Sequence, residues 1–321
     1  MCAMKHFKNE EENMRKLKLM TLLLVLMALM LPLSVFARDI EPIVSTDWLE
    51  KNLSNPKLIV VDIRKPEEYK AGHIPGAINV FYNSWAVKKG ALDNQLPSDD
   101  DLKDLLSASG IQPDSLVVVA GLTESGPDRV NTTRVGWTLK YAGVENVGIL
   151  DGGHNKWINR EKKALSTDVV RPKAKPYRGK FNKDLLATKD YVMAQMGKAV
   201  IVDSREPDFF MGKQKLPFVD KAGRIPGAVN LPTAQVFEKY PPGDHLEMCC
   251  NTFKDKNALA NMASGVVGND KSKEIIVYCD TGRVASAWWW LLHEVLEYKN
   301  VKNFDGSMQE WAMDPKAPVQ P

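Results

Sequence analysis

The chain has 321 residues, of which 44% are hydrophobic and 26% are charged, so its composition is that of a soluble globular protein of about two domains. Its formal net charge of +3 is too small to indicate nucleic-acid binding or attachment to an anionic membrane surface. The five histidines show no metal-ligand spacing, and no Gly-rich phosphate-binding loop occurs. The sequence therefore predicts neither a metal nor a cofactor.

The amino terminus carries the pattern of a secretory signal peptide. Arg15, Lys16 and Lys18 precede an almost wholly apolar run at residues 19–33, and residues 35–37 fit a small-residue cleavage site. This pattern predicts a signal peptide over residues 1–37 and an exported product, in the periplasm of a bacterium. The apolar run is short for a membrane span, but an uncleaved signal that anchors the protein in the membrane is the alternative.

Two segments of the remaining chain match each other. Val-Asp-Ile-Arg at residues 61–64 is followed by Gly-His-Ile-Pro-Gly-Ala at 72–77, and Val-Asp-Ser-Arg at 202–205 is followed by Gly-Arg-Ile-Pro-Gly-Ala at 223–228. Each copy also ends with Asp-Gly and a tryptophan five residues after the glycine, Trp157 or Trp311. The repeat predicts a first domain over residues 38–165, a linker over 166–187 and a second domain over 188–321.

Short apolar strands alternate with helical stretches in the first copy. The predicted strands are residues 58–62, 77–80, 116–120 and 147–150, and the predicted helices are 66–71, 99–109 and 132–142. This alternation predicts an α/β fold in which each domain has a central parallel sheet with helices on both faces. In such sheets, reactive groups lie at the carboxyl ends of the strands.

One cysteine lies at such a position. Cys279 directly follows an apolar strand predicted at residues 275–278 and precedes a helix predicted at 285–296. The backbone N–H groups of a tight loop and the start of a helix both favour a thiolate, so we expect a nucleophilic sulfur. From these local residues alone, a buried and inert cysteine at the end of a strand remains the alternative.

The order of these motifs resembles the rhodanese family, and the resemblance covers both copies. It consists of Asp-x-Arg, Gly-x-Ile-Pro-Gly-Ala, a strand that ends in a cysteine before a short Gly-containing loop, and Asp-Gly followed by tryptophan. The resemblance implies a sulfurtransferase. Its cysteine, Cys279, would take a sulfane sulfur from a donor such as thiosulfate, become a persulfide, and pass the sulfur to cyanide, a small thiol or a thiol protein.

The first copy lacks this cysteine. The position that matches Cys279 falls at Ala120 or Gly121, so the first copy is expected to be inactive and either structural or one wall of an interdomain cleft. In the second copy, the predicted active loop consists of Asp280, Thr281, Gly282, Arg283, Val284, Ala285 and Ser286.

Each loop residue has an expected role. The backbone N–H groups of the loop are expected to face the sulfur, with Gly282 in the left-handed conformation that such a loop needs. Arg283 is expected to bind an anionic donor, or alternatively to pair with Asp280. Thr281 offers a hydroxyl near the sulfur or the helix start, and Ser286 is expected to cap the helix or bond to local backbone. Asp280 would repel a dianion such as thiosulfate unless a cation offsets its charge.

Asp203 and Arg205 are expected to support the loop as a buried ion pair. Residues 232–270 are predicted to be an insertion that roofs the site or forms a dimer contact. Within it, Cys249 and Cys250 are expected to pack on a helix, with a resolving role toward Cys279 as the alternative. Trp288, Trp289 and Trp290 are expected to be packing residues that cover the core, an interface and the rim of the cleft, and Trp311 is expected to fill the core.

Two other functions compete with sulfur transfer. A cysteine phosphatase needs an arginine six residues after its cysteine, where this chain has Ala285, and Arg283 lies only four residues on. The other alternative is a non-enzymatic persulfide carrier, whose cysteine hands sulfur to one dedicated partner without turnover.

Overall fold

The computed structural model describes residues 14, 18, 38–238 and 250–321, and the fold is contained in one compact unit, Asp39–Pro321. The predicted signal peptide lies outside the described residues except for Met14 and Lys18. Among the helices of the described residues, none combines the length and the apolar character needed to cross a bilayer.

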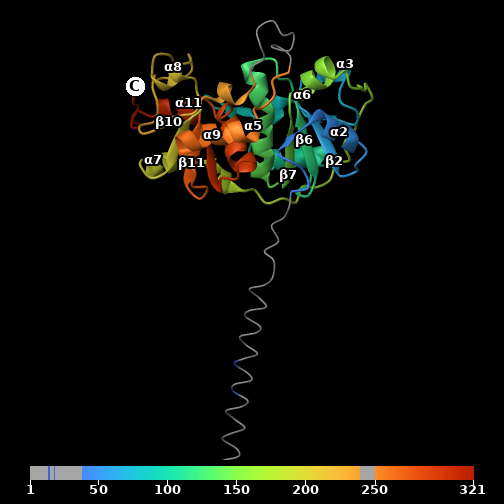
Figure 1. Cartoon of the computed structure of the whole chain (residues 1–321), viewed down its shortest axis with the longest axis horizontal. Helices are drawn as coiled ribbons and strands as arrows, with labels where there is room; N and C mark the ends of the chain where they lie inside the picture. Colours follow the sequence, from blue (N-terminus) through green and yellow to red (C-terminus); the bar gives the residue numbers. More distant parts are fainter. Residues whose placement is uncertain (1–13, 15–17, 19–37, 239–249) are drawn as a thin grey trace, which may run out of the picture. The chain divides into compact units, whose positions relative to one another are not determined.

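The first copy forms a five-stranded parallel sheet in the order β1-β7-β6-β2-β3. Figure 1 shows β7, β6 and β2 of this sheet beside one another. Its strands are β1 (Ile43–Val44), β2 (Leu58–Asp62), β3 (Ile78–Asn79), β6 (Leu116–Ala120) and β7 (Asn146–Leu150). Its helices are α2 (Thr46–Asn52), α3 (Pro66–Ala71), α4 (Asp99–Ser109), α5 (Gly126–Ala142) and α6 (Gly153–Asn155), which a π-helical turn at Lys156–Arg160 continues. A 3-10 turn (Tyr82–Ser84) leads into an antiparallel hairpin of β4 (Val87–Lys89) and β5 (Leu92–Gln95).

The second copy repeats this arrangement. Its strands lie in the order β8-β12-β11-β9-β10, and all their pairings are parallel. The strands are β8 (Leu186–Ala187), β9 (Val200–Asp203), β10 (Val229–Asn230), β11 (Glu274–Tyr278) and β12 (Asn300–Phe304). The helices are α7 (Lys189–Gln195), α8 (Pro207–Phe210), α9 (Lys256–Val267), α10 (Ala285–Trp290) and α11 (Ser307–Met313), with 3-10 turns at Lys183–Leu185 and Thr233–Val236 and a π-helical turn at Leu291–Val295. The predicted α/β fold with two tandem domains is confirmed.

The strand register identifies the residue of the first copy that corresponds to Cys279. Tyr278 lies beside Asp203 in the second sheet, as Ala120 lies beside Asp62 in the first. The next residues are Cys279 and Gly121. Their carbonyl groups accept equivalent hydrogen bonds, from the Met308 N–H at 3.1 Å and from the His154 N–H at 2.8 Å. Gly121 therefore stands where the second copy has its cysteine.

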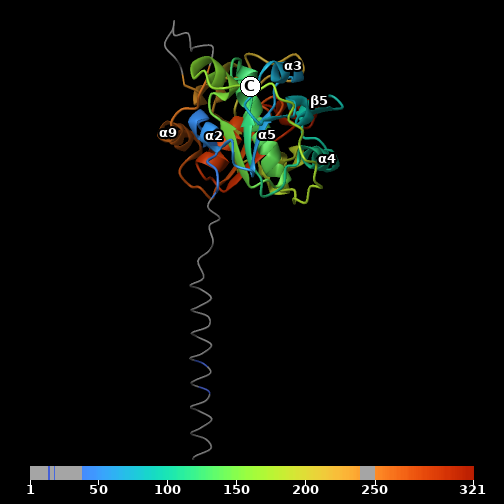
Figure 2. The ribbon, with the colours of Figure 1, turned by 90° about the vertical axis from the view of Figure 1, so that its right-hand side faces the viewer.

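Helices α5 and α10 pack against each other and join the two copies. Figure 2 shows α5 in the middle of the unit, with α4 and β5 to one side and α2 and α9 to the other. Gly136 of α5 makes room for Trp290, because a Cβ at this glycine would lie 2.8 Å from the Trp290 ring. Trp288, Trp289 and Trp290 are all 0% exposed. As expected, these tryptophans are packing residues, and Trp290 lies in the interface between the copies.

Several boundaries differ from the sequence prediction. Helix α5 begins at Gly126 rather than at residue 132, because Ser125 and Asp128 form a capping box around its first turn. The last two residues of the predicted linker, Leu186–Ala187, form β8, which pairs with β12 at the edge of the second sheet. They therefore belong to the second domain and not to a linker. Helix α9 precedes β11 as α4 precedes β6, so it is a regular element of the repeat and not part of an insertion.

Cys250 is buried, non-helical and disulfide-bonded, which corrects the prediction of a helical packing residue, and Cys249 lies outside the described residues.

Candidate active site

Cys279 lies between the end of β11 and the start of α10, and its side chain is 1% exposed. The backbone N–H groups of Ala285, Thr281 and Val284 act on its sulfur as donors that lower the pKa of the thiol. Among the described residues it is the one free cysteine. The expected arrangement of loop amides around the sulfur is therefore present.

The pKa of the Cys279 thiol is nevertheless raised above its ordinary value. Burial of the sulfur is the largest cause, and the negative charge of Asp280 is the second. The three loop amides lower the pKa, but they offset only part of this increase. The loop amides therefore favour the thiolate, as expected, but burial opposes them, and the sequence does not reveal how completely the side chain is removed from water.

Gly282 and Ser307 fix the base of the loop. Gly282 has a φ of 71°, and a Cβ there would lie 2.5 Å from the carbonyl oxygen of Asp305, so only glycine fits without strain. The Ser307 hydroxyl oxygen accepts the N–H of Cys279 at 3.1 Å and that of Gly282 at 2.9 Å. Ser307 itself has a φ of 49°, which is unusual for a residue other than glycine.

Sequence reasoning missed Ser307. Its counterpart in the first copy is Gly153, which has a φ of 57°. The two copies differ here, with Asp-Gly-Gly in the first and Asp-Gly-Ser in the second. This difference could have pointed to Ser307, because a serine at a position that favours glycine suggests that its hydroxyl group makes a needed hydrogen bond.

The predicted buried ion pair of Asp203 and Arg205 is present. The Arg205 Nη2 lies 2.7 Å from Asp203 Oδ2 and donates to the Gly223 carbonyl oxygen at 2.7 Å. The first copy repeats the pair, with 2.6 Å between Arg64 Nη2 and Asp62 Oδ2. Since both copies have it, the pair belongs to the framework of the fold that supports the loop.

Asp280 also contacts this framework. Its Oδ1 lies 3.4 Å from Arg205 Nη1, so its ion-pair partner is Arg205. The alternative prediction, a pair of Asp280 with Arg283, is not what the structure shows. Burial raises the pKa of Asp280 to about 6, although Arg205 acts in the opposite direction. Arg205 is thus the cation that offsets part of the charge of Asp280, and Arg283 lies in the cleft, where its positive charge acts on the Tyr82 hydroxyl.

Thr281 and Ser286 contact the first copy. The Thr281 hydroxyl accepts a hydrogen bond from the Asn94 side-chain amide at 3.2 Å. The Ser286 hydroxyl donates to the Arg283 carbonyl at 2.6 Å and lies 3.0 Å from the hydroxyl of Thr133 in α5. Ser286 therefore bonds to local backbone, as one of its two expected roles required, and does not cap the helix.

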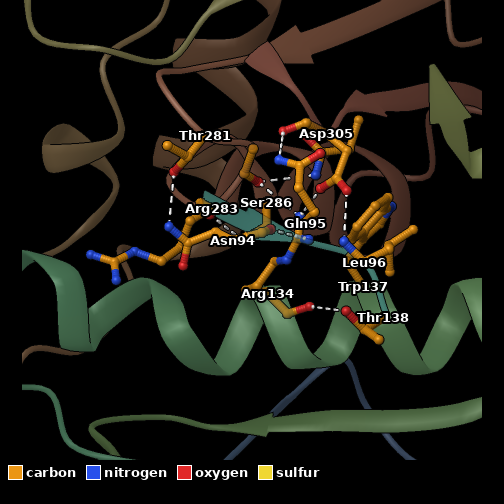
Figure 3. Close-up of polar contacts among 12 residues, drawn as sticks. Asn94, Gln95, Leu96, Arg134, Trp137, Thr138, Thr281, Arg283, Ser286 and Asp305 are labelled. Carbon is orange, nitrogen blue, oxygen red and sulfur yellow. Dashed lines mark hydrogen bonds and ion pairs between the residues drawn. The ribbon is translucent and has the colours of Figure 1, made fainter. Parts of the chain in front are cut away.

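Arg134 of α5 joins the first copy to the base of the loop (Figure 3), and no motif or periodicity in the sequence indicates this role. It is 0% exposed, and its Nη1 lies 2.5 Å from Asp305 Oδ1. It also donates to the carbonyl oxygens of Asn94 at 2.5 Å and Gly282 at 3.4 Å. The second oxygen of Asp305 accepts the Leu96 N–H at 2.7 Å. One buried arginine thus connects α5, the β5 strand and the active loop.

The loop opens into a cleft of about 620 Å³ that both copies line. The first copy contributes Asn83, Ala86, Val87, Lys88, Asp93 and Asn94, mostly from its β4–β5 hairpin. The second copy contributes Leu216, Phe218, Cys279, Asp280, Thr281, Arg283 and Val284. Of the two roles expected for the first copy, the wall of an interdomain cleft is the one found.

Asp280→Asn is expected to shift the pH profile of Cys279 alkylation to lower pH. Above about pH 6 the Asp280 carboxylate is ionised and repels the thiolate, so removal of its charge lowers the pKa of the thiol. Iodoacetamide should then react several-fold faster at pH 7. Asp208→Asn, at an exposed acid of the same domain, is the matched control. An unchanged profile would mean that the charge of Asp280 does not reach the sulfur.

Comparison with known proteins identifies the family. The family description of the rhodanese-like domain matches residues 45–160 and 188–314. A protein of Mycolicibacterium smegmatis named "Putative thiosulfate sulfurtransferase" is 32% identical over 293 residues, which are 87% of this chain and 98% of that protein. The sulfur carrier protein TtuD of Thermus thermophilus is 31% identical over 291 residues, 84% of this chain and 93% of that protein.

Solved structures agree with this assignment. SseA of Escherichia coli, from a study of 3-mercaptopyruvate sulfotransferases, superposes with a TM-score of 0.67 at 26% identity, over 83% of this chain and 98% of that one. The anaerobic ergothioneine biosynthesis enzyme of Chlorobium limicola has the same fold, with a TM-score of 0.73 at 23% identity, over 87% of this chain and 70% of that one. The chain therefore belongs to the rhodanese family, as a member with two rhodanese-like domains.

Proposed function

We propose that the protein is a sulfurtransferase that works through a persulfide on Cys279. The observation that carries the proposal is a free cysteine at the carboxyl end of β11, with three loop amides on its sulfur and a cleft in front of it. Amide N–H groups stabilise the negative charge that a thiolate or a persulfide carries. A loop of this size encloses one sulfur atom and lacks the arginine with which a cysteine phosphatase holds an oxyanion.

The proposed reaction involves the Cys279 sulfur, the sulfur donor and the acceptor. The Cys279 thiolate attacks the outer sulfur of thiosulfate, the S–S bond breaks, and sulfite leaves with the electron pair. Cyanide or a thiolate then attacks the outer sulfur of the persulfide, and Cys279 leaves as a thiolate. Arg283 lies in the cleft and is the group that we assign to the anionic end of the donor. Asp280 to Ser286 would form the active loop, with Asp203 and Arg205 behind it.

The named relatives support two versions of this function. The similarity to the Mycolicibacterium protein named "Putative thiosulfate sulfurtransferase" favours a turnover enzyme, and the similarity to a sulfur carrier protein of Thermus favours a persulfide carrier. We favour the enzyme, because the cleft is large enough to admit small donors and acceptors directly. On the basis of the amino-terminal pattern, we also propose that the protein is exported and acts in the periplasm.

Mass spectrometry tests the proposal. Mature protein from residue 38 is incubated with thiosulfate or a polysulfide, and its peptides are measured before and after cyanide is added. The expected result is one added sulfur on the peptide that contains Cys279, lost again on addition of cyanide, with many thiocyanate molecules formed per protein. Loading with a single release would favour the carrier, and no loading from any sulfane donor would contradict both versions.

A further inference from the structure

A second cavity of about 490 Å³ lies beside the cleft, and we call it the side chamber. Its wall in the first copy is the start of α5, at Gly126, Pro127, Arg129 and Val130. Residues of the second copy, including Phe209, Ala234 and Phe237, form the opposite wall. Cys279 lines only the cleft, but the side chamber and the cleft share Leu216, Asp280 and Val284. The chamber and the cleft that Cys279 lines therefore adjoin at these three residues.

The side chamber is much larger than thiosulfate or cyanide requires. Its size and its mainly apolar lining, with a few charged groups, are those of a site for an organic molecule. Its charged residues are Arg129, Arg205, Glu206 and Asp280. Arg205 is already occupied by Asp203, Asp280 and the Gly223 carbonyl, and Glu206 is exposed to solvent.

Arg129 is the other cation of the chamber, and its guanidinium has no ion-pair partner among the described residues. Its guanidinium lies 5.6 Å from the centre of the Phe237 ring, and its Nε is buried without a hydrogen-bond acceptor. A buried N–H group without an acceptor is unfavourable, and an anionic oxygen is the group that a guanidinium binds best. The combination of aromatic rings and one unpaired arginine fits a ligand with an apolar body and a carboxylate.

We propose that the side chamber binds an organic thiol that has an apolar body and an anionic group, and that this thiol is the acceptor of the persulfide sulfur. The anionic group would lie on Arg129, the body between Phe209 and Phe237, and the sulfur would enter the cleft past the shared residues. This inference rests on the proposed function. The acceptor thiolate attacks the outer sulfur of Cys279–S–SH, the S–S bond breaks, and Cys279 leaves as a thiolate while the acceptor becomes R–S–SH.

Ligand binding without chemistry tests the chamber. The probes are 3-phenylpropionate and the uncharged 3-phenylpropan-1-ol, titrated into Cys279→Ala protein, which keeps every lining residue of the chamber. Arg129→Leu should weaken binding of the carboxylate about tenfold or more and leave the alcohol unchanged, as expected for one charge-assisted contact. Ala234→Trp, at an exposed residue of the chamber wall, should weaken binding of both probes by filling the space. Arg178→Leu, at an exposed arginine of the linker region, is the control.

Transfer of sulfur to 3-(4-mercaptophenyl)propionate tests the acceptor role. Both chamber variants should lower kcat/KM for this thiol about tenfold relative to the Arg178→Leu control. The chamber assignment is overturned if the carboxylate binds equally to Arg129→Leu and Arg178→Leu proteins, or if Ala234→Trp has no effect on either probe. Probe binding that responds to the variants while transfer to the thiol does not would overturn the acceptor role. Failure of Cys279 to accept sulfur would instead contradict the proposed function and would leave the binding result standing.

Discussion

Cys279→Ser is expected to lower thiocyanate formation from thiosulfate and cyanide by roughly a thousandfold or more, as is usual when the nucleophile of a covalent mechanism is removed. Serine fits the same space and can accept the same N–H groups of Thr281, Val284 and Ala285. Its hydroxyl group, however, cannot be ionised at neutral pH and cannot form a persulfide. The variant should therefore fold normally, bind the donor, and fail in the first chemical step.

The measurement combines a rate with two controls. Thiocyanate is followed over many turnovers, mass spectra of the variant should show no added sulfur, and the Tm should stay within a few degrees of the unmodified protein. Cys279→Ala should behave in the same way, since it lacks the sulfur equally. Activity that survives in either variant would remove the persulfide mechanism, whatever the similarity of the fold to known sulfurtransferases.

The repeat and the framework of the fold could be predicted from the sequence because they depend on local patterns. β2, α3, α4 and β6 were predicted with the observed bounds, since each is an apolar run or an amphipathic stretch bounded by turn residues. The β4–β5 hairpin was not predicted, because its strands are short and largely polar. That hairpin supplies much of one wall of the cleft, so the shape of the site could not be read from the sequence.

The features of the candidate site that depend on local sequence order were also predictable, and those that depend on distant contacts were not. The position of Cys279 and the left-handed conformation of Gly282 follow from the order strand, cysteine, glycine, helix. The raised pKa of Cys279 depends on complete burial of its side chain, which no local pattern in the sequence indicates. Arg134 lies far from the loop in the sequence, and no periodicity indicates that its guanidinium meets Asp305. Contacts between distant segments are where reasoning from one sequence fails.

Arg134→Met is expected to destabilise the protein by about 3–5 kcal/mol, the usual effect of removing one partner of a buried ion pair. Methionine keeps much of the volume of the side chain, but Asp305 then holds a buried charge without its cation. The carbonyl groups of Asn94 and Gly282 also lose a donor. Urea unfolding at pH 7 measures the change.

The double variant Arg134→Met/Asp305→Asn separates charge from packing. Removal of the unpaired carboxylate should restore part of the lost stability, so that the double variant unfolds at a higher urea concentration than Arg134→Met alone. Sulfur transfer should be lower than in the unmodified protein in both variants, because Arg134 also donates to the Gly282 carbonyl from the side of the first copy. A loss below about 1 kcal/mol in the single variant would mean that solvent reaches this pair. In that case the contact could not be what holds the first copy against the loop that follows Cys279.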